Sequence, residues 1–337
     1  MTMNGDDTVK VVPVHHFGRW VGAGVALLFI AMLVHTLFSK VPDTTAKKVC
    51  HLVNAHRVCA FPVRWRFQWN FVFQYFTTSE VLHGLLVTLE LTALSMTIGI
   101  ILGVLIAVMR LSHNRLLSST AWTYTWFFRG TPVYVQLIFW SNIAILFPYI
   151  TLGVPFFHVT FWSFHSVSLF SPFRAAIVAF GLNEAAYMSE IARSGLIAVD
   201  EGQSEAATSL GMTRGQTLRF VVLPQAMRVI LPPTGNEVIS MLKTTSLASY
   251  IGVAELLGVT GFISAANFET MALLIVASLW YLIVTTVLSI GQFYLERKFA
   301  KGALRTPPMT PIQRIRHDVR GIVAKFPTGH RALGGSR

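Results

Sequence analysis

Six long apolar segments dominate this sequence of 337 residues. A helix needs about 20 mainly apolar residues to cross a bilayer, and each segment has about that length or more. The segments cover residues 20–38, 81–109, 121–150, 175–197, 229–257 and 271–294. Helices and closed barrels are the structures that satisfy every backbone polar group within lipid. The pattern therefore predicts an all-α membrane protein with about six transmembrane helices.

The overall composition agrees with a membrane protein. Hydrophobic residues make up 53% of the chain, charged residues 12%, and the mean hydropathy is +0.57, whereas a soluble domain has about 25% charged residues. The net charge is +12, but the basic residues lie mostly between and after the apolar segments. That distribution favours the positive-inside rule over a nucleic-acid-binding face, so we expect no nucleic-acid partner.

The lysines and arginines predict the topology. Arg110, Arg115 and the basic residues of 193–228 and of 297–337 should lie in the cytoplasm, whereas 151–172 and 258–267 carry no Lys or Arg and should face outward. The first apolar segment is longer than a signal-peptide core and no small-residue cleavage site follows it, so we expect a retained helix. The predicted regions are a cytosolic segment 1–19, an extra transmembrane helix 20–38, an outer loop 39–80, a transmembrane core 81–296 and a basic tail 297–337, which we expect to be disordered in the cytosol. Both termini would then be cytosolic.

Metal and nucleotide chemistry find little support in the sequence. Cys50 and Cys59 are the two cysteines, without a CxxC spacing, and no cluster has metal-ligand spacing. In the outer loop they would face a compartment that permits a disulfide, but the spacing leaves bonded and free thiols both open. No Gly-Lys pair occurs, so the chain has no Walker A loop. We therefore expect no metal, no cofactor bound by this chain and no enzymatic activity.

Small residues recur at every fourth position of the second apolar segment, at Ser95, Gly99, Gly103 and Ala107. Such a face lets two helices approach closely. The pattern does not distinguish packing within one chain from contact with a second copy.

Two apolar segments carry polar stripes. Ionisable residues inside a membrane segment are costly and usually functional, and two stripes suggest a shared water-filled cavity. The substrate-path candidates are Asn183, Tyr187 and Glu190 in the fourth segment and Asn236, Glu237, Ser240, Lys243 and Thr244 in the fifth. Glu190 is also spaced to pair with Arg193 as a structural ion pair. Lys243 has no acidic residue three or four positions away, so its partner must come from elsewhere.

A polar, helix-favouring stretch, Glu205-Ala206-Ala207 followed by Gly211 and Leu223-Pro224, lies between two apolar segments. Gly211 allows a bend, and Pro224 should end the helix because proline restricts the residue before it. An ordinary cytosolic connector could have this composition. The pattern, however, resembles the EAA loop of ABC-transporter permeases, which forms a coupling helix against a separate ATPase subunit.

Other motifs extend the resemblance over about residues 82–296. They are Gly84-Leu-Leu-Val-Thr88, Phe128-Arg-Gly-Thr-Pro132, Tyr187-Met-Ser-Glu-Ile-Ala-Arg-Ser-Gly195 and Lys243-Thr-Thr-Ser-Leu247. Together they resemble the polar amino-acid branch of these permeases, the histidine/glutamine type. The family core has five helices, so the helix at 20–38 would be an addition. In related permeases for basic amino acids an acidic residue can follow the equivalent of Lys243; here Thr244 follows, which argues mildly against a purely cationic substrate.

The resemblance implies the permease subunit of an ATP-driven importer for a polar amino acid or a related small zwitterion, in the bacterial cytoplasmic (inner) membrane. It implies ABC ATPase subunits that hold ATP and Mg, a second permease copy or paralogue, a soluble amino-acid-binding protein and membrane lipid as partners. The coupling loop would cover 201–225. Its ATPase-coupling residues would be Glu205, Ala206, Ala207, Gly211, Leu223 and Pro224.

Two other classes of protein are alternatives to this interpretation. A secondary, ion-coupled amino-acid transporter would need its own ion site in broken helices, often within an inverted repeat. A channel or a structural membrane subunit would need no coupling helix. The EAA stretch has no role in either alternative, and co-purification with a separate ATPase would distinguish the three.

Overall fold

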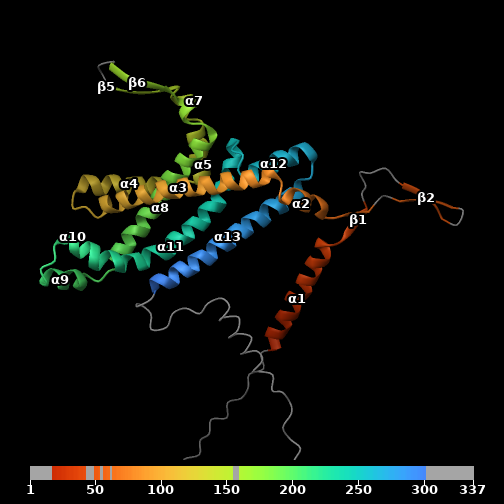
Figure 1. Ribbon diagram of the computed structural model, residues 1–337, viewed down its shortest axis with the longest axis horizontal. Helices are drawn as coiled ribbons and strands as arrows, with labels where there is room; N and C mark the ends of the chain where they lie inside the picture. The colour runs from red at the N-terminus through yellow and green to blue at the C-terminus, as the bar shows by residue number, and fades with distance from the viewer. Residues whose placement is uncertain (1–16, 43–48, 54–55, 61–62, 155–158, 301–337) are drawn as a thin grey trace, which may run out of the picture. The chain divides into compact units, whose positions relative to one another are not determined.

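The computed structural model describes residues 17–42, 49–53, 56–60, 63–154 and 159–300 (Figure 1). The predicted tail beyond residue 300 and most of the N-terminal segment lie outside these ranges. The chain divides into two compact units, one of Met1–Thr78 with Ile263–Val276 and one of Ser79–Phe262 with Ala277–Arg337. The candidate site lies entirely in the second unit.

The first unit contains the predicted extra helix, which the structure places at α1, Phe17–Leu37. The loop that follows, predicted to face outward, contains short strands as well as a helix within the otherwise helical chain. It contains two antiparallel pairs, β1 Lys40–Pro42 with β4 Val63–Trp65 and β2 Val49–Val53 with β3 His56–Ala60, and then helix α2, Trp69–Phe76. Short valine-rich stretches favour strands over helices, and a two-stranded hairpin can form from such stretches locally. The side chain of Trp69 joins α2 to the end of α1, because its Nε1–H donates to the Leu37 carbonyl at 2.9 Å.

The second unit is a helical assembly interrupted by one β-hairpin. Its helices before the polar stretch are α3 Ser79–Arg110, α4 Arg115–Gly130, α5 Val133–Ser141, α6 Ile143–Leu146, α7 Ser166–Leu169 and α8 Pro172–Ile197. The hairpin pairs β5 Tyr149–Val154 with β6 Val159–His165. The later elements are α9 Glu201–Ser209, α10 Arg214–Thr217, the π-helix Leu218–Val222, α11 Leu223–Thr244, the 3₁₀ segment Thr245–Ile251, α12 Leu256–Asn267 and α13 Thr270–Ala300. Helices α12 and α13 each have residues in both units.

The core of this unit is built on the close packing of α3 against α8. The small-residue face of α3 lies at this contact: a Cβ on Gly103 would come within 2.5 Å of the Met188 Cβ, and Ser95 is fully buried. Phe180 and Leu91 are fully buried beside it. The stripe of small residues thus serves packing within the chain, one of the two possibilities that the sequence left open.

Two helices of the described residues, α3 and α13, are long and apolar enough to cross a membrane by themselves, and a third span is obtained if the bent pair Arg214–Ile251 and Leu256–Asn267 counts as one. The pair is bent by 43°. Shorter or more polar helices account for the other predicted segments: α1 for the first, α4 with α5 for the third and α8 for the fourth.

Two predicted segment ends are wrong. The third segment was expected to reach Ile150, but its helices end at Leu146 and the chain enters strand β5 at Tyr149. The fifth was expected to extend from about 229 to 257, but α11 ends at Thr244, and Gly252 with φ 85° turns the chain before α12. Average hydropathy over a window does not locate either break, because apolar residues flank both of them.

Candidate functional site

The predicted coupling stretch forms an exposed helix with defined ends. Asp200 caps α9 at its N-terminus, because its Oδ1 accepts the Gly202 N–H at 2.8 Å. At the other end the N–H of Gly211 donates to the Thr208 carbonyl and the N–H of Met212 to the Ala207 carbonyl, at 2.9 and 3.1 Å. These two bonds form a Schellman motif, which requires a residue with positive φ, and Gly211 has φ 80°. The predicted bend at Gly211 is therefore confirmed.

The Leu223-Pro224 pair does not end a helix, contrary to the expectation from the sequence. α10, the π-helix at Leu218–Val222 and α11 follow one another directly, and Pro224 lies in the first turn of α11. The π-helix widens the turn just before the proline, so the chain continues through it.

The three EAA residues differ in their exposure to solvent. Ala207 is buried against the rest of the chain, whereas Glu205 and Ala206 are exposed. Leu210, just beyond α9, is 83% exposed. α9 is therefore an exposed helix that contacts the rest of the chain through Ala207.

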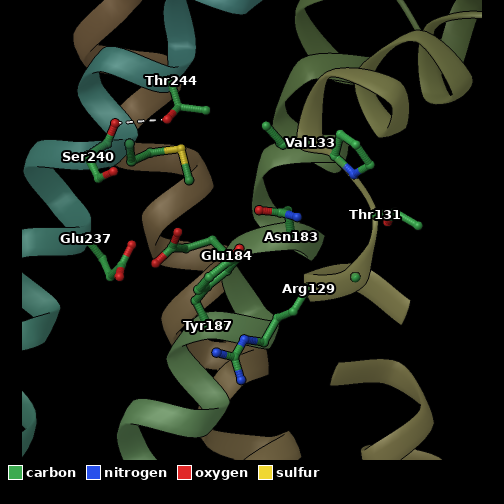
Figure 2. A pocket seen from close by; sticks show the side chains of 12 residues that line it. Arg129, Thr131, Val133, Asn183, Glu184, Tyr187, Glu237, Ser240 and Thr244 are labelled. Carbon is green, nitrogen blue, oxygen red and sulfur yellow. Dashed lines mark hydrogen bonds between the residues drawn. The ribbon is translucent and has the colours of Figure 1, made fainter. Parts of the chain in front are cut away.

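A pocket of about 560 Å³ lies among α4, α5, α8 and α11 (Figure 2). It contains acidic, basic, amide, hydroxyl and aromatic side chains together. Its lining consists of Arg129, Gly130, Thr131, Pro132, Val133, Asn183, Glu184, Tyr187, Glu237, Ser240, Met241 and Thr244. Five of the substrate-path candidates, namely Asn183, Tyr187, Glu237, Ser240 and Thr244, are thus brought together from two distant helices.

Two carboxyl groups face each other across this pocket, Glu184 from α8 and Glu237 from α11 (Figure 2). Glu184 is only 3% exposed, and its Oε1 has no hydrogen-bond partner among the described residues. Glu184 is not among the predicted substrate-path residues, although a carboxyl group inside an apolar segment next to Asn183 is a signal in the sequence. A buried, unpaired carboxyl oxygen directed toward a pocket is costly unless a ligand supplies the partner.

Arg129 supplies the positive charge of the pocket. Its guanidinium lies over the Tyr187 ring, 5.3 Å from the ring centroid, in a cation–π arrangement that orients the group. Arg129 is itself exposed, so its donors remain accessible from the pocket.

The break between α4 and α5 is held by amide side chains. The Nε2 group of Gln136 lies 2.7 Å from the Thr131 Oγ1 and 3.0 Å from the Phe128 carbonyl. The Nδ2 group of Asn183 donates to the same Phe128 carbonyl at 2.9 Å. Asn183 therefore joins α8 to the break and keeps Arg129, which follows Phe128, at the pocket wall.

Three predicted substrate-path residues lie elsewhere. Glu190 bridges two arginines, with its Oε1 at 3.3 Å from Arg110 and its Oε2 at 2.9 Å from Arg193, which favours the structural ion pair. The Oδ1 of Asn236 accepts from Gln292 at 3.0 Å. Lys243 is exposed and is not among the residues that line the pocket, so its place in the substrate path stays a prediction.

The helical fold, the broken spans and a polar pocket inside an apolar assembly define the class of a multi-pass membrane transport subunit. Residues 99–301 match the family described as the binding-protein-dependent transport system inner membrane component. The chain belongs to this family.

Similar proteins within this family are named for the transport of amino acids. The chain is 42% identical to the arginine transport system permease protein of Corynebacterium glutamicum, over 88% of this chain and 85% of that protein. It is 40% identical to the L-cystine transport system permease protein of Bacillus subtilis, over 64% and 84%. The crystal structure of an amino acid ABC transporter with histidines matches at a TM-score of 0.58 and 35% identity, over 68% of this chain and 98% of that one.

The comparisons establish that the protein is a permease subunit of an amino-acid ABC transporter, a component of the inner membrane rather than an enzyme. They favour this class over a secondary transporter or a structural subunit. Membership implies an ATPase and a binding protein as partners. Among the described residues no group of three or more His, Cys, Asp or Glu is placed to hold a metal ion.

Proposed function

We propose that this subunit carries an α-amino acid with a cationic side chain through the pocket described above. The observation that carries the proposal is the facing pair of Glu184 and Glu237 in a pocket that also contains Arg129 (Figure 2). Carboxylates attract ammonium and guanidinium groups, and an arginine side chain can bind a carboxylate through two parallel hydrogen bonds. A cationic amino acid presents both kinds of group to complementary partners.

The size and lining of the pocket support a small polar ligand. Its volume of about 560 Å³ falls within the usual range of small-molecule sites, about 300–1,000 Å³. Thr244 occupies a position where a related permease can carry an acidic residue, but Glu184 and Glu237 together supply the negative charge that a cation needs. The relative named for the transport of arginine supports an amino acid that carries charge.

For the energy source, we propose that α9 docks on a separate ATPase subunit through Glu205, Ala206 and the exposed Leu210. ATP and Mg would be bound there and not by this chain. Closure of the ATPase pair would move α9, and the continuous run from α10 through α11 would carry that movement to Glu237 and Ser240 in the pocket. A second permease copy or paralogue, a soluble binding protein that delivers the amino acid, membrane lipid and two cytosolic termini complete the proposed assembly.

The test is a selectivity measurement on the assembled transporter in proteoliposomes, with its ATPase and binding protein. Uptake of labelled arginine and of labelled glutamine is compared in Glu184→Gln, Glu237→Gln and, as a matched control, Glu90→Gln, which changes an exposed carboxyl group of α3 outside the pocket. We expect each pocket variant to reduce arginine uptake relative to glutamine at least tenfold, because a hydrogen bond to a charged group contributes about 1.5–3 kcal/mol. Unchanged selectivity in both pocket variants would refute the cationic substrate.

A further inference from the structure

Glu255 has a fully buried carboxyl group and does not line the pocket. Its exposed fraction is 0%, and it lies in the short connection between the 3₁₀ segment and α12. Burying a charge or an acid within an apolar assembly is costly unless hydrogen bonds compensate for the lost water. Glu255 therefore requires hydrogen-bond partners inside the protein.

Three donors from three helices converge on the Glu255 side chain. The hydroxyl of Tyr281 in α13 donates to Oε2 at 2.8 Å, and the hydroxyl of Thr88 in α3 lies 3.2 Å from the same oxygen. The N–H of Gly258 in α12 donates to Oε1 at 2.7 Å. Because Gly258 belongs to the first turn of α12, Glu255 also acts as the N-cap of that helix, where a negative charge is favoured.

The connection is joined to α3 by its backbone as well. The N–H of Leu256 donates to the Thr88 Oγ1 at 3.1 Å. At Gly84 of the same helix a Cβ would lie 3.2 Å from the Glu255 carbonyl oxygen and 2.9 Å from the Val259 Cγ2. α3 and the start of α12 therefore meet backbone to backbone, and the hydrogen bonds define the register of that contact.

This junction lies on the same broken span as the pocket. α11 carries Glu237, Ser240 and Thr244 on the pocket wall, the 3₁₀ segment follows directly, and Gly252 turns the chain into the connection that holds Glu255. At this turn the helical hydrogen bonding between α11 and α12 is interrupted, so other contacts must fix the position of the junction. Glu255 links the junction to α3 and α13.

Stability alone is a poor reason for such a network, because replacing buried charged groups by well-packed apolar ones is often neutral or stabilising. What a hydrogen-bonded carboxyl group adds is a defined geometry. We propose that Glu255 is a positioning residue for transport: it holds the junction between α11 and α12 against α3 and α13, so that the pocket wall on α11 keeps its place opposite α8. The proposal rests on the proposed function of the pocket.

The first experiment measures geometry and does not depend on the substrate. Spin labels at Leu105→Cys in α3 and Phe262→Cys in α12, both exposed positions, are introduced in a background without Cys50 and Cys59. The assembled transporter should give a narrow distance distribution. Glu255→Met should broaden it, Glu255→Gln should restore most of it because the amide keeps one acceptor oxygen, and Tyr124→Phe, which removes a hydroxyl that donates to the Leu182 carbonyl elsewhere, should leave it narrow.

The second experiment measures uptake in the same variants. We expect Glu255→Met to raise KM about tenfold, or about 1.4 kcal/mol, the size of effect that a remote contact exerts on a site, while the ratio of arginine to glutamine uptake is unchanged. Adding Tyr281→Phe should cause little further loss, because both changes remove one network. Unchanged KM with a narrow distance distribution, or fully additive losses, would overturn the positioning role. Failure of the proposed function would instead appear in the selectivity of the Glu184 and Glu237 variants and would leave the distance measurement interpretable.

Discussion

Gly99 of α3 lies directly against Glu184 of α8: a Cβ added at Gly99 would come within 2.5 Å of the Glu184 Cγ and 2.7 Å of its Cβ. The small-residue face of α3 therefore packs against the base of a pocket carboxyl group. This contact couples helix packing to the position of the charge in the pocket.

The contact predicts that Gly99→Ala impairs transport without removing any charge. The methyl group must displace Glu184, and overpacking of this kind costs about 1–3 kcal/mol. We expect uptake to fall about tenfold while the protein stays assembled. Gly291→Ala in α13 is the matched control, because a Cβ there meets nothing within 4 Å. Equal uptake by the two variants would show that Glu184 tolerates displacement.

A second prediction concerns Gly211, which ends α9 with φ 80°. Gly211→Val forces a β-branched residue into this region, at a cost of about 1–2 kcal/mol, and should misplace the coupling helix. We expect the variant to enter the membrane and to lose most substrate-stimulated ATP hydrolysis in the reconstituted complex. Gly215→Ala, in α10 and with open space around its Cβ, should keep that stimulation. Full stimulation in the Gly211 variant would remove the proposed coupling role of α9.

Lys243 provides a third prediction, because it is exposed on α11 beside the pocket residue Thr244 but does not line the pocket. Its ammonium group offers three donors to the carboxylate of an amino acid. Lys243→Met should keep ATPase assembly and reduce uptake strongly, and Lys243→Arg should be intermediate because the charge stays while its shape changes. Basal ATP hydrolysis reports assembly. Normal uptake by the Met variant would exclude Lys243 from the substrate path.

The fourth prediction concerns the two cysteines of the β2–β3 hairpin. Cys50 and Cys59 are register partners across β2 and β3, and residues directly opposite in an antiparallel pair have Cα atoms about 4.5–5.5 Å apart, within the range of a disulfide. We predict a disulfide bond that stabilises this hairpin by on the order of 2–3 kcal/mol. Thiol labelling with and without reductant measures it. Two thiols that react fully before reduction would rule the bond out.

Membrane character, the family and the short polar helix α9 could be predicted from the sequence because each depends on local pattern. Apolar length predicts a span, and the spacing of Glu205, Gly211 and Pro224 lies within one continuous segment. The polar stripes correctly brought Asn183 and Tyr187 together with Glu237 and Ser240, since residues four apart share a helix face. Local pattern also misled: Pro224 looks like a helix end, but its place in a first turn after a π-helix lets the helix continue.

What only the tertiary structure decided are the relations between distant segments. Glu184 becomes a pocket residue because Glu237, more than 50 residues later, faces it from α11. Glu190, which the sequence paired with Arg193, gains a second ion-pair partner because Arg110 approaches it from α3. Glu255 lies 0% exposed at the meeting of three helices, yet in sequence it is one acidic residue in an apolar run. Periodicity reports which side chains share a face, but the partner of a buried charge depends on which helices pack together, and that follows from the close packing of the whole chain.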